Sequence, residues 1–266
     1  MEATLCIITP VFNGARYLES CIRNVAEQWT EGIVHWVVDG GSRDGSTEIL
    51  TKLSEEFSHL KWISEPDKGQ SDAMNKGLRL AGNAWVGFLN VDDFYEPELL
   101  PKILGRIKAE KDPDAFWMGN LHVRDAEDKL ISFNQPGNMR LALMLADMCE
   151  WPFNPSAYFY PARLHNKIGF FPEGEHYAMD YDFMFRLLFS GWQIQYFNET
   201  WGNFRLLAEA KTGQDQAGNQ SYLRAEAIRQ HYLQKAGPGL RAEVALLRGF
   251  WAVRNKCLSL IRKFSP

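Results

Sequence analysis

The chain has 266 residues, 45% of them hydrophobic and 23% charged, which allows one core with an appendage or two small domains. Its net charge of −4 excludes a general nucleic-acid binder, whose surface would be basic. No signal peptide and no membrane-spanning apolar stretch are visible in the sequence. We therefore expect a cytoplasmic protein that is soluble or at most bound to a membrane surface.

The four cysteines lie far apart, and no CxxC pair occurs. This spacing predicts reduced thiols in a cytosolic protein and argues against a zinc site or a disulfide framework. The six histidines likewise lack metal-ligand spacing. The cysteines are Cys6, Cys21, Cys149 and Cys257.

Strands and helices are expected to alternate four times in the first hundred residues. This alternation predicts an α/β fold, with a parallel sheet covered by helices on both faces. Ligands on such sheets bind beyond the carboxyl ends of the strands, where Asn13, Asp39, Asp67 and Asp92 are expected to converge. The expected strands are 5–11, 33–38, 62–63 and 84–89. One expected helix spans 17–25, and a second begins at Ser46 or Thr47. A third is capped by Ser71 and ends near Ala81, and a fourth begins at Pro97.

The middle of the chain gives a more mixed pattern. Two extended runs joined by a charged turn at 124–129 predict a hairpin. Residues 208–221 are poor in apolar side chains, which indicates a mobile loop. The other expected elements are strands at 115–123, 130–133, 157–160 and 193–197 and helices at 139–147 and 181–189.

The tail from Leu240 onward predicts a strongly amphipathic basic helix. It has two adjacent apolar stripes and arginines on the remaining face. We expect it to pack against its own domain, against a partner chain in a homodimer, or on the anionic inner face of the plasma membrane. The stripes are Leu240, Val244, Leu247, Trp251, Leu258 and Ile261, and Leu246, Phe250, Val253, Cys257, Leu260 and Phe264.

Five motifs occur in a fixed order over residues 4–206. They are TPVFNGARYL, VVDGGSRDGS, SEPDKGQSDAMNKG, FLNVDDFYEP and MDYDFMFRL. Together they resemble the family 2 glycosyltransferases. The resemblance implies a GT-A fold with a Rossmann-like, mostly parallel sheet, a nucleotide-sugar donor, a divalent cation and inversion at the anomeric carbon. It also divides the chain into a catalytic domain, 1–216, and a C-terminal helical extension, 217–266.

The resemblance implies a donor site on the first three motifs. Asp39 matches the family position that contacts the nucleotide base, and the third motif is expected near base and ribose. Met74 stands where many relatives carry Arg, so one phosphate or base contact is expected to be missing. Basic residues such as Arg205 and Lys211 would close over the diphosphate. The expected donor residues are Thr9, Pro10, Val11, Asn13, Asp39, Asp67, Asp72, Asn75, Asn90, Asp92 and Arg205.

Adjacent carboxylates at Asp92 and Asp93 end an apolar run, where burying charge without a partner is costly. A Mg²⁺ or Mn²⁺ ion held by these carboxylates and by phosphate oxygens would balance the charge. The family pattern here is Asp-x-Asp, which Asn90-Val91-Asp92 matches in part. We expect Asp92 to be the main ligand, Asp93 a second one, and Asn90 a ribose contact.

The fifth motif is expected to supply the general base. The family places an aspartate at the start of a helix near the acceptor, and Asp180 matches that position. Asp182 is the alternative, or a partner for Arg186. The family contacts the donor sugar or the acceptor at a segment that here contains Trp151, Asn154, Ser156 and Tyr158, and Trp151 could stack on a sugar ring. His176 lies four residues before Asp180.

The resemblance implies transfer of a sugar from a UDP-, GDP- or dTDP-sugar to a hydroxyl of a glycan or lipid-linked acceptor in bacterial envelope synthesis. A sugar nucleotidyltransferase is one alternative, although the first loop, Val11 to Gly14, lacks that class's glycine-rich basic sequence. A non-catalytic sugar-nucleotide or glycan-binding relative is the other, since Asn90 and Met179 depart from the family pattern. The absence of Gly-x-Gly-x-x-Gly after the first strand disfavours an NAD enzyme.

Overall fold

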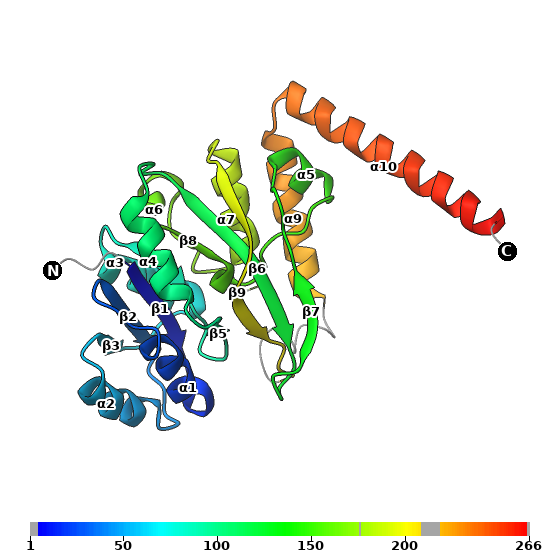
Figure 1. Ribbon diagram of the computed structural model, residues 1–266. Helices are drawn as coiled ribbons and strands as arrows, with labels where there is room; N and C mark the ends of the chain where they lie inside the picture. The colour runs from blue at the N-terminus through cyan, green and yellow to red at the C-terminus, as the bar shows by residue number, and fades with distance from the viewer. Residues whose placement is uncertain (1–4, 176, 209–218, 265–266) are drawn as a thin grey trace.

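Nine strands form one sheet in the computed structural model, which describes residues 5–175, 177–208 and 219–264 (Figure 1). The strands are β1 Leu5–Val11, β2 Ile33–Asp39, β3 Leu60–Ser64, β4 Trp85–Phe88, β5 Phe94–Tyr95, β6 Phe116–Arg124, β7 Leu130–Asn134, β8 Tyr158–Pro161 and β9 Ile194–Arg205. The helices are α1 Ala15–Ala26, α2 Ser46–Glu56, α3 Gln70–Ala81, α4 Leu99–Ala109, α5 Leu141–Ala146, the short η1 Pro155–Ala157, α6 Leu164–Ile168, α7 Met179–Phe189, α9 Gln220–Lys235 and α10 Pro238–Phe264.

The first four strands are parallel and lie in the order β3-β2-β1-β4. The next strands, β8 and β6, pair antiparallel with their neighbours, and β9 then runs parallel to β6. The hairpin of β6 and β7 is antiparallel, as the charged turn predicted. The α/β class and the parallel N-terminal half are therefore confirmed, and the C-terminal half of the sheet is mixed.

Helices cover both faces of the sheet, as predicted. Side chains alternate along β1, so that Leu5 and Ile7 join one core and Cys6 and Ile8 the other. The first core is closed by α1 and α4, and the second by α3 and α7. Because β1 is buried on both sides, its sequence is a nearly continuous apolar run, whereas the edge strand β3 is largely exposed or half-buried.

Some predicted boundaries are wrong. Ser71 does not cap α3, because Gly69 occupies the N-cap and the Ser71 hydroxyl donates to the Glu175 carbonyl at 3.2 Å. Helix α4 begins at Leu99, not at Pro97. Strand β9 continues to Arg205, and α9 begins inside the predicted 208–221 loop, of which 209–218 lie outside the described residues.

The cysteines that the structure describes are unpaired, as predicted. Cys6, Cys21 and Cys149 are free thiols, and burial raises the pKa of Cys6 and of Cys21 to about 12. Such thiols stay protonated and unreactive at neutral pH. Among the described helices, none is long and apolar enough to cross a membrane.

The helices after β9 pack against the rest of the chain. On α9, Tyr232 is buried and its ring stacks on Phe185 with 4.9 Å between centroids. Early in α10, the Arg248 guanidinium donates to the Leu145 carbonyl of α5 at 2.8 Å. Beyond this contact α10 extends away from the body (Figure 1). A separate extension at 217–266 stays a prediction.

Two buried histidines should make the protein less stable in acid. Burial lowers the pKa of His35 to about 3 and that of His165 to about 4, from 6.5 in the unfolded chain. Below pH 6.5 the unfolded chain therefore binds more protons, so the free energy of unfolding falls as the pH drops toward 4. The slope is about 1.4 kcal/mol per pH unit for each histidine.

Urea unfolding at pH 5 and pH 6.5 measures this slope. His35→Gln should lower the slope by about 1.4 kcal/mol per pH unit, because one of the two neutral histidines is gone. His231, which is exposed, offers the matched control His231→Gln, with the slope expected to stay unchanged. Equal slopes for His35→Gln and the unaltered chain would contradict the prediction.

Candidate active site

A cavity of about 570 Å³ opens at the carboxyl ends of β1, β2 and β4. We call it the rim cavity. Of the predicted site residues, it contains Pro10, Val11, Asp67, Asn90 and Asp92. Its full lining is Pro10, Val11, Phe12, Gly40, Asp67, Gly69, Gln70, Ala73, Asn90, Val91 and Asp92. The rim on which the polar residues were expected to converge is therefore a real cavity.

The loops that form the rim cavity pack closely at Gly40. The Gly40 amide donates to the Val11 carbonyl at 2.9 Å, which joins the ends of β1 and β2. A Cβ atom on Gly40 would lie 2.5 Å from Asp67 Oδ2, closer than real contacts allow. Asp67 in turn accepts the Gly69 amide at 2.8 Å. Glycine at position 40 thus lets the Asp67 carboxylate approach the end of β2.

Asp39, the predicted base contact, is fully buried and is not part of the rim cavity lining. Its carboxylate accepts the amides of Gly41 and Ser42 at 3.1 and 3.0 Å and the Ser64 hydroxyl at 2.6 Å. It also accepts the Ser42 hydroxyl. In this structure Asp39 shapes the loop after β2 and joins it to β3, and its role toward a base stays a prediction.

The structure places two more predicted residues of the first loop outside the lining. Thr9 is buried, and its hydroxyl lies 2.9 Å from His35 Nε2. Asn13 is exposed and accepts the Arg43 amide at 3.0 Å. Both side chains hold neighbouring segments together, and neither belongs to the rim cavity lining.

The α3 residues predicted near the ribose also point elsewhere. The Asn75 side chain is buried and exchanges two hydrogen bonds with the Phe171 backbone, at 2.8 and 3.0 Å. Asp72 accepts the Lys68 amide at 3.1 Å. Met74, in the place of the family's Arg, is fully buried in the core. None of the three belongs to the rim cavity lining.

The adjacent aspartates separate into one that faces the cavity and one that faces the interior. Asp92 lines the rim cavity. Asp93 is only 1% exposed and accepts hydrogen bonds from the amides of Asn90 (3.0 Å) and Asn154 (2.7 Å) and from the Arg205 backbone (3.0 Å). Burial, together with the charge of Asp92, raises the pKa of Asp93 to about 8. The structure thus does not bring the two carboxylates together as paired ligands.

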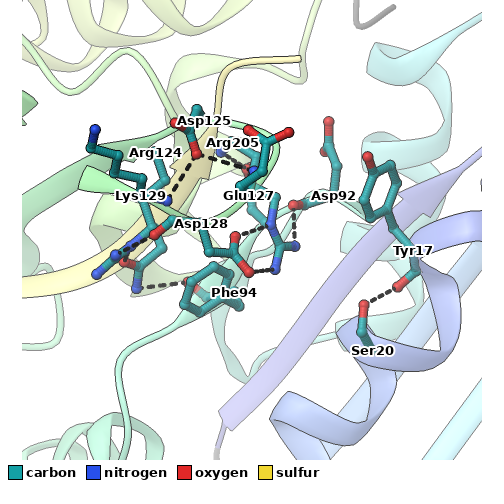
Figure 2. A network of polar contacts seen from close by, with 12 residues as sticks. Tyr17, Ser20, Asp92, Phe94, Arg124, Asp125, Glu127, Asp128, Lys129 and Arg205 are labelled. Carbon is teal, nitrogen blue, oxygen red and sulfur yellow. Dashed lines mark hydrogen bonds and ion pairs between the residues drawn. The ribbon is translucent and has the colours of Figure 1, made fainter. Parts of the chain in front are cut away.

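Arg205 ties the Asp92 segment to the β6–β7 turn (Figure 2). Its guanidinium forms a bidentate pair with Asp128, at 2.5 and 3.0 Å, and donates to the Asp92 carbonyl at 2.7 Å. The guanidinium carbon lies 4.6 Å from the centroid of the Phe94 ring and 5.8 Å from the centroid of the Tyr17 ring. The sequence predicted Arg205 as a diphosphate contact. Here it positions the backbone beside Asp92, and Lys211 lies outside the described residues.

A second cavity, of about 450 Å³, adjoins the first and shares Gln70 and Asn90 with it. We call it the aromatic cavity. Gln70 donates to Asn90 Oδ1 at 3.0 Å, so these two side chains form a bridge between the cavities. Its full lining is Gln70, Asn90, Val123, Ser132, Trp151, Phe153, Pro155, Tyr177, Ala178, Met179, Asp180, Phe204, Leu206 and Ser221.

Asp180 lines the aromatic cavity from the first turn of α7. It accepts a hydrogen bond from the Tyr158 hydroxyl at 3.1 Å, and burial raises the pKa of Tyr158, so the phenol stays a donor. Asp182 is not part of this lining and pairs with Arg186 at 2.7 Å, as predicted. His176 lies outside the described residues.

The oxygen ligands at the rim cavity suit a hard cation. Asp92 and Asp67 supply carboxylates, which Mg²⁺ and Mn²⁺ prefer. Over the described part of the chain, no three His, Cys, Asp or Glu side chains gather into a complete metal site. Mg²⁺ is commonly held by one or two carboxylates plus substrate phosphates, so this donor set fits a cation that binds together with a nucleotide.

Residues 6–170 match the family described as Glycosyl transferase family 2. The chain belongs to that family. The Escherichia coli chondroitin synthase is 27% identical over 183 residues, which are 68% of this chain and 26% of the synthase. This chain therefore corresponds to about a quarter of that relative's length.

Two solved structures share the fold. Staphylococcus aureus TarS 1–349 in complex with UDP-GlcNAc aligns with a TM-score of 0.66 at 14% identity, over 90% of this chain and 69% of that one. The mannosyltransferase PcManGT from Pyrobaculum calidifontis, in complex with GDP-Man and Mn²⁺, aligns with a TM-score of 0.62 at 18% identity, over 100% and 77%. The predicted GT-A fold is confirmed.

Proposed function

We propose that the protein transfers a sugar from a nucleotide-diphosphate donor to an acceptor hydroxyl, with inversion at the anomeric carbon. The observation that carries this proposal is the pair of adjoining cavities. One contains Asp92, the other contains Asp180, and Gln70 and Asn90 line both. A donor in the rim cavity and an acceptor in the aromatic cavity would meet at this bridge.

Inversion in one step needs a single base beside the attacking oxygen. Asp180 takes the proton of the acceptor hydroxyl as that oxygen bonds to the anomeric carbon. The bond from this carbon to the leaving phosphate oxygen breaks, and the nucleoside diphosphate departs with the electron pair. The Tyr158 hydroxyl holds the Asp180 carboxylate in place through their 3.1 Å hydrogen bond.

The leaving diphosphate carries concentrated negative charge in a cavity that already contains Asp67 and Asp92. Asp92 would hold Mn²⁺ or Mg²⁺, which neutralises the charge that develops on the phosphate oxygens. Arg205 keeps the Asp92 backbone in place from behind. The complex of PcManGT with GDP-Man and Mn²⁺ supports the use of a divalent ion.

The aromatic cavity suits the ring of a sugar acceptor. Trp151, Phe153, Tyr177 and Phe204 contribute aromatic faces to it, and such faces pack against the apolar side of a pyranose. We therefore propose a glycan or a lipid-linked sugar as the acceptor, in keeping with the name of the related chondroitin synthase.

A panel of UDP-, GDP- and dTDP-sugars with Mn²⁺ tests the proposal. Thermal shift identifies the donor, and release of nucleoside diphosphate upon addition of glycan acceptors reports transfer. A non-catalytic binding relative would be stabilised by a donor without releasing diphosphate. A sugar nucleotidyltransferase would instead produce pyrophosphate from a nucleoside triphosphate and a sugar phosphate. Either of those two results would overturn the proposal.

Gly40→Ala should weaken donor binding while leaving the fold intact. The new methyl group displaces Asp67, and we expect the free energy of donor binding to weaken by about 1–3 kcal/mol, or ~5- to 150-fold in affinity. Calorimetry with the donor identified by the panel measures the change. Gly105→Ala on α4 is the matched control, because no atom lies within 4 Å of the added Cβ there. Equal donor affinities for Gly40→Ala and Gly105→Ala would exclude this role for Gly40.

A further inference from the structure

Helix α10 exposes an apolar surface that the proposed reaction does not use. Leu246, Phe250 and Val253 are 75, 72 and 63% exposed. They are four and three residues apart, so they share one face of the helix, which we call the α10 stripe. A different face packs on the body, where Val244 is buried and Leu247 contacts the core. The stripe is therefore not part of the protein's own core.

The start of α10 is held firmly, so the helix presents its stripe at a fixed place. Glu243 pairs with Arg140 at 2.6 Å, and Arg248 donates to the Leu145 carbonyl at 2.8 Å. Arg140 is the N-cap of α5, and Leu145 lies within that helix. From there the rest of the helix projects from the body (Figure 1). A projecting helix can lie on an extended surface without displacing the domain.

The charge of α10 identifies the kind of surface. The whole chain has a net charge of −4, yet this helix is strongly basic and has Glu243 as its one acidic residue. Beside the stripe, the Arg254 guanidinium lies over the Trp251 ring, 3.9 Å from its centroid. Trp and Arg next to apolar side chains suit a lipid headgroup region. The basic residues are Arg241, Arg248, Arg254, Lys256, Arg262 and Lys263.

We propose that α10 lies on an anionic lipid surface, with the α10 stripe among the upper acyl chains and the Arg254 guanidinium at the phosphates. Charge disfavours a second copy of this chain as the partner of the α10 stripe, because pairing two such helices would bring two sets of positive charges together. Each basic residue near an anionic bilayer instead adds favourable attraction. This assignment does not depend on the transferase activity.

Flotation of the full chain with vesicles tests the assignment. We expect binding to vesicles of phosphatidylcholine with phosphatidylglycerol, little binding to phosphatidylcholine alone, and weaker binding at high salt. The double variant Phe250→Glu, Val253→Glu should lose about tenfold or more of the partition onto anionic vesicles. Both positions are exposed, so circular dichroism should show an unchanged fold.

The matched control places the same two charges on another helix. Tyr222 and Leu223 on α9 are 63 and 55% exposed, and Tyr222→Glu, Leu223→Glu should bind vesicles like the unaltered chain. Equal partition of the two double variants would overturn the assignment. A second result would also overturn it. If the unaltered chain did not bind vesicles, and light scattering showed it as a dimer but the variant Phe250→Glu, Val253→Glu as a monomer, the stripe would be a homodimer contact.

Discussion

Asp180→Asn should lower the rate of sugar transfer by about 10²- to 10⁴-fold, the usual contribution of a general base. The amide keeps the size of the side chain but cannot accept the proton of the acceptor hydroxyl. Asp180 lines the aromatic cavity and not the rim cavity, so the affinity for the donor should stay close to that of the unaltered enzyme. Single-turnover transfer gives the rate, and calorimetry with the donor gives the affinity.

Asp182→Asn is the control, because it removes the same charge from the same helix. Asp182 pairs with Arg186 at 2.7 Å and accepts the Tyr232 hydroxyl at 3.2 Å, so its loss should cost stability, about 1 kcal/mol, and little activity. The opposite result, with transfer lost in Asp182→Asn and kept in Asp180→Asn, would move the base to Asp182.

Strand β1 could be predicted because it is buried on both faces. Every residue of β1, from Leu5 to Val11, is buried, so the strand stands out as an apolar run. By contrast, only the first part of β9 was predicted, because polar residues such as Asn198 and Glu199 interrupt it. Helix α9 lies within the predicted helical extension, but its bounds were not predicted, since Tyr232 is its one buried side chain among the described residues.

The motifs predicted which loops form the site better than which side chains face it. Asp67, Asn90 and Asp92 do line the rim cavity. Asp39 and Asn75, from equally recognisable motifs, turn inward to hold the backbones of neighbouring segments. A motif places a residue on a loop, but the direction of its side chain depends on hydrogen bonds that form only in the folded protein.

Asp128 illustrates what the sequence could not reveal. It lies in the charged turn after β6, which predicted only a hairpin, yet its carboxylate holds Arg205, 77 residues further along the chain. The pairing arises because β6 and β9 run side by side, with Arg124 opposite Arg205. Nothing in the spacing of the charges along the chain indicates that register.

Asp92→Asn should remove the part of donor binding that depends on the metal. Asp92 is the carboxylate of the aspartate pair that lines the rim cavity, and an amide oxygen is a much weaker ligand for Mn²⁺ than a carboxylate. We expect the affinity for Mn²⁺ in the presence of the nucleoside diphosphate to fall by about 100-fold, because changing a residue that only supports a metal ligand already costs about 10- to 100-fold. Titration of Mn²⁺ followed by electron paramagnetic resonance measures this directly, without any activity assay.

Two comparisons make the Asp92 result specific. Glu127→Gln removes one negative charge from the same polar network (Figure 2) but lies outside the rim cavity, so Mn²⁺ binding should be retained.

Asp93→Asn should chiefly lower stability, because an amide cannot accept all three hydrogen bonds that Asp93 now accepts from Asn90, Asn154 and Arg205. If Asp93→Asn folded normally and lost Mn²⁺, while Asp92→Asn kept it, the buried aspartate would be the ligand. The loop after β4 would then have to turn its side chains over when a donor binds.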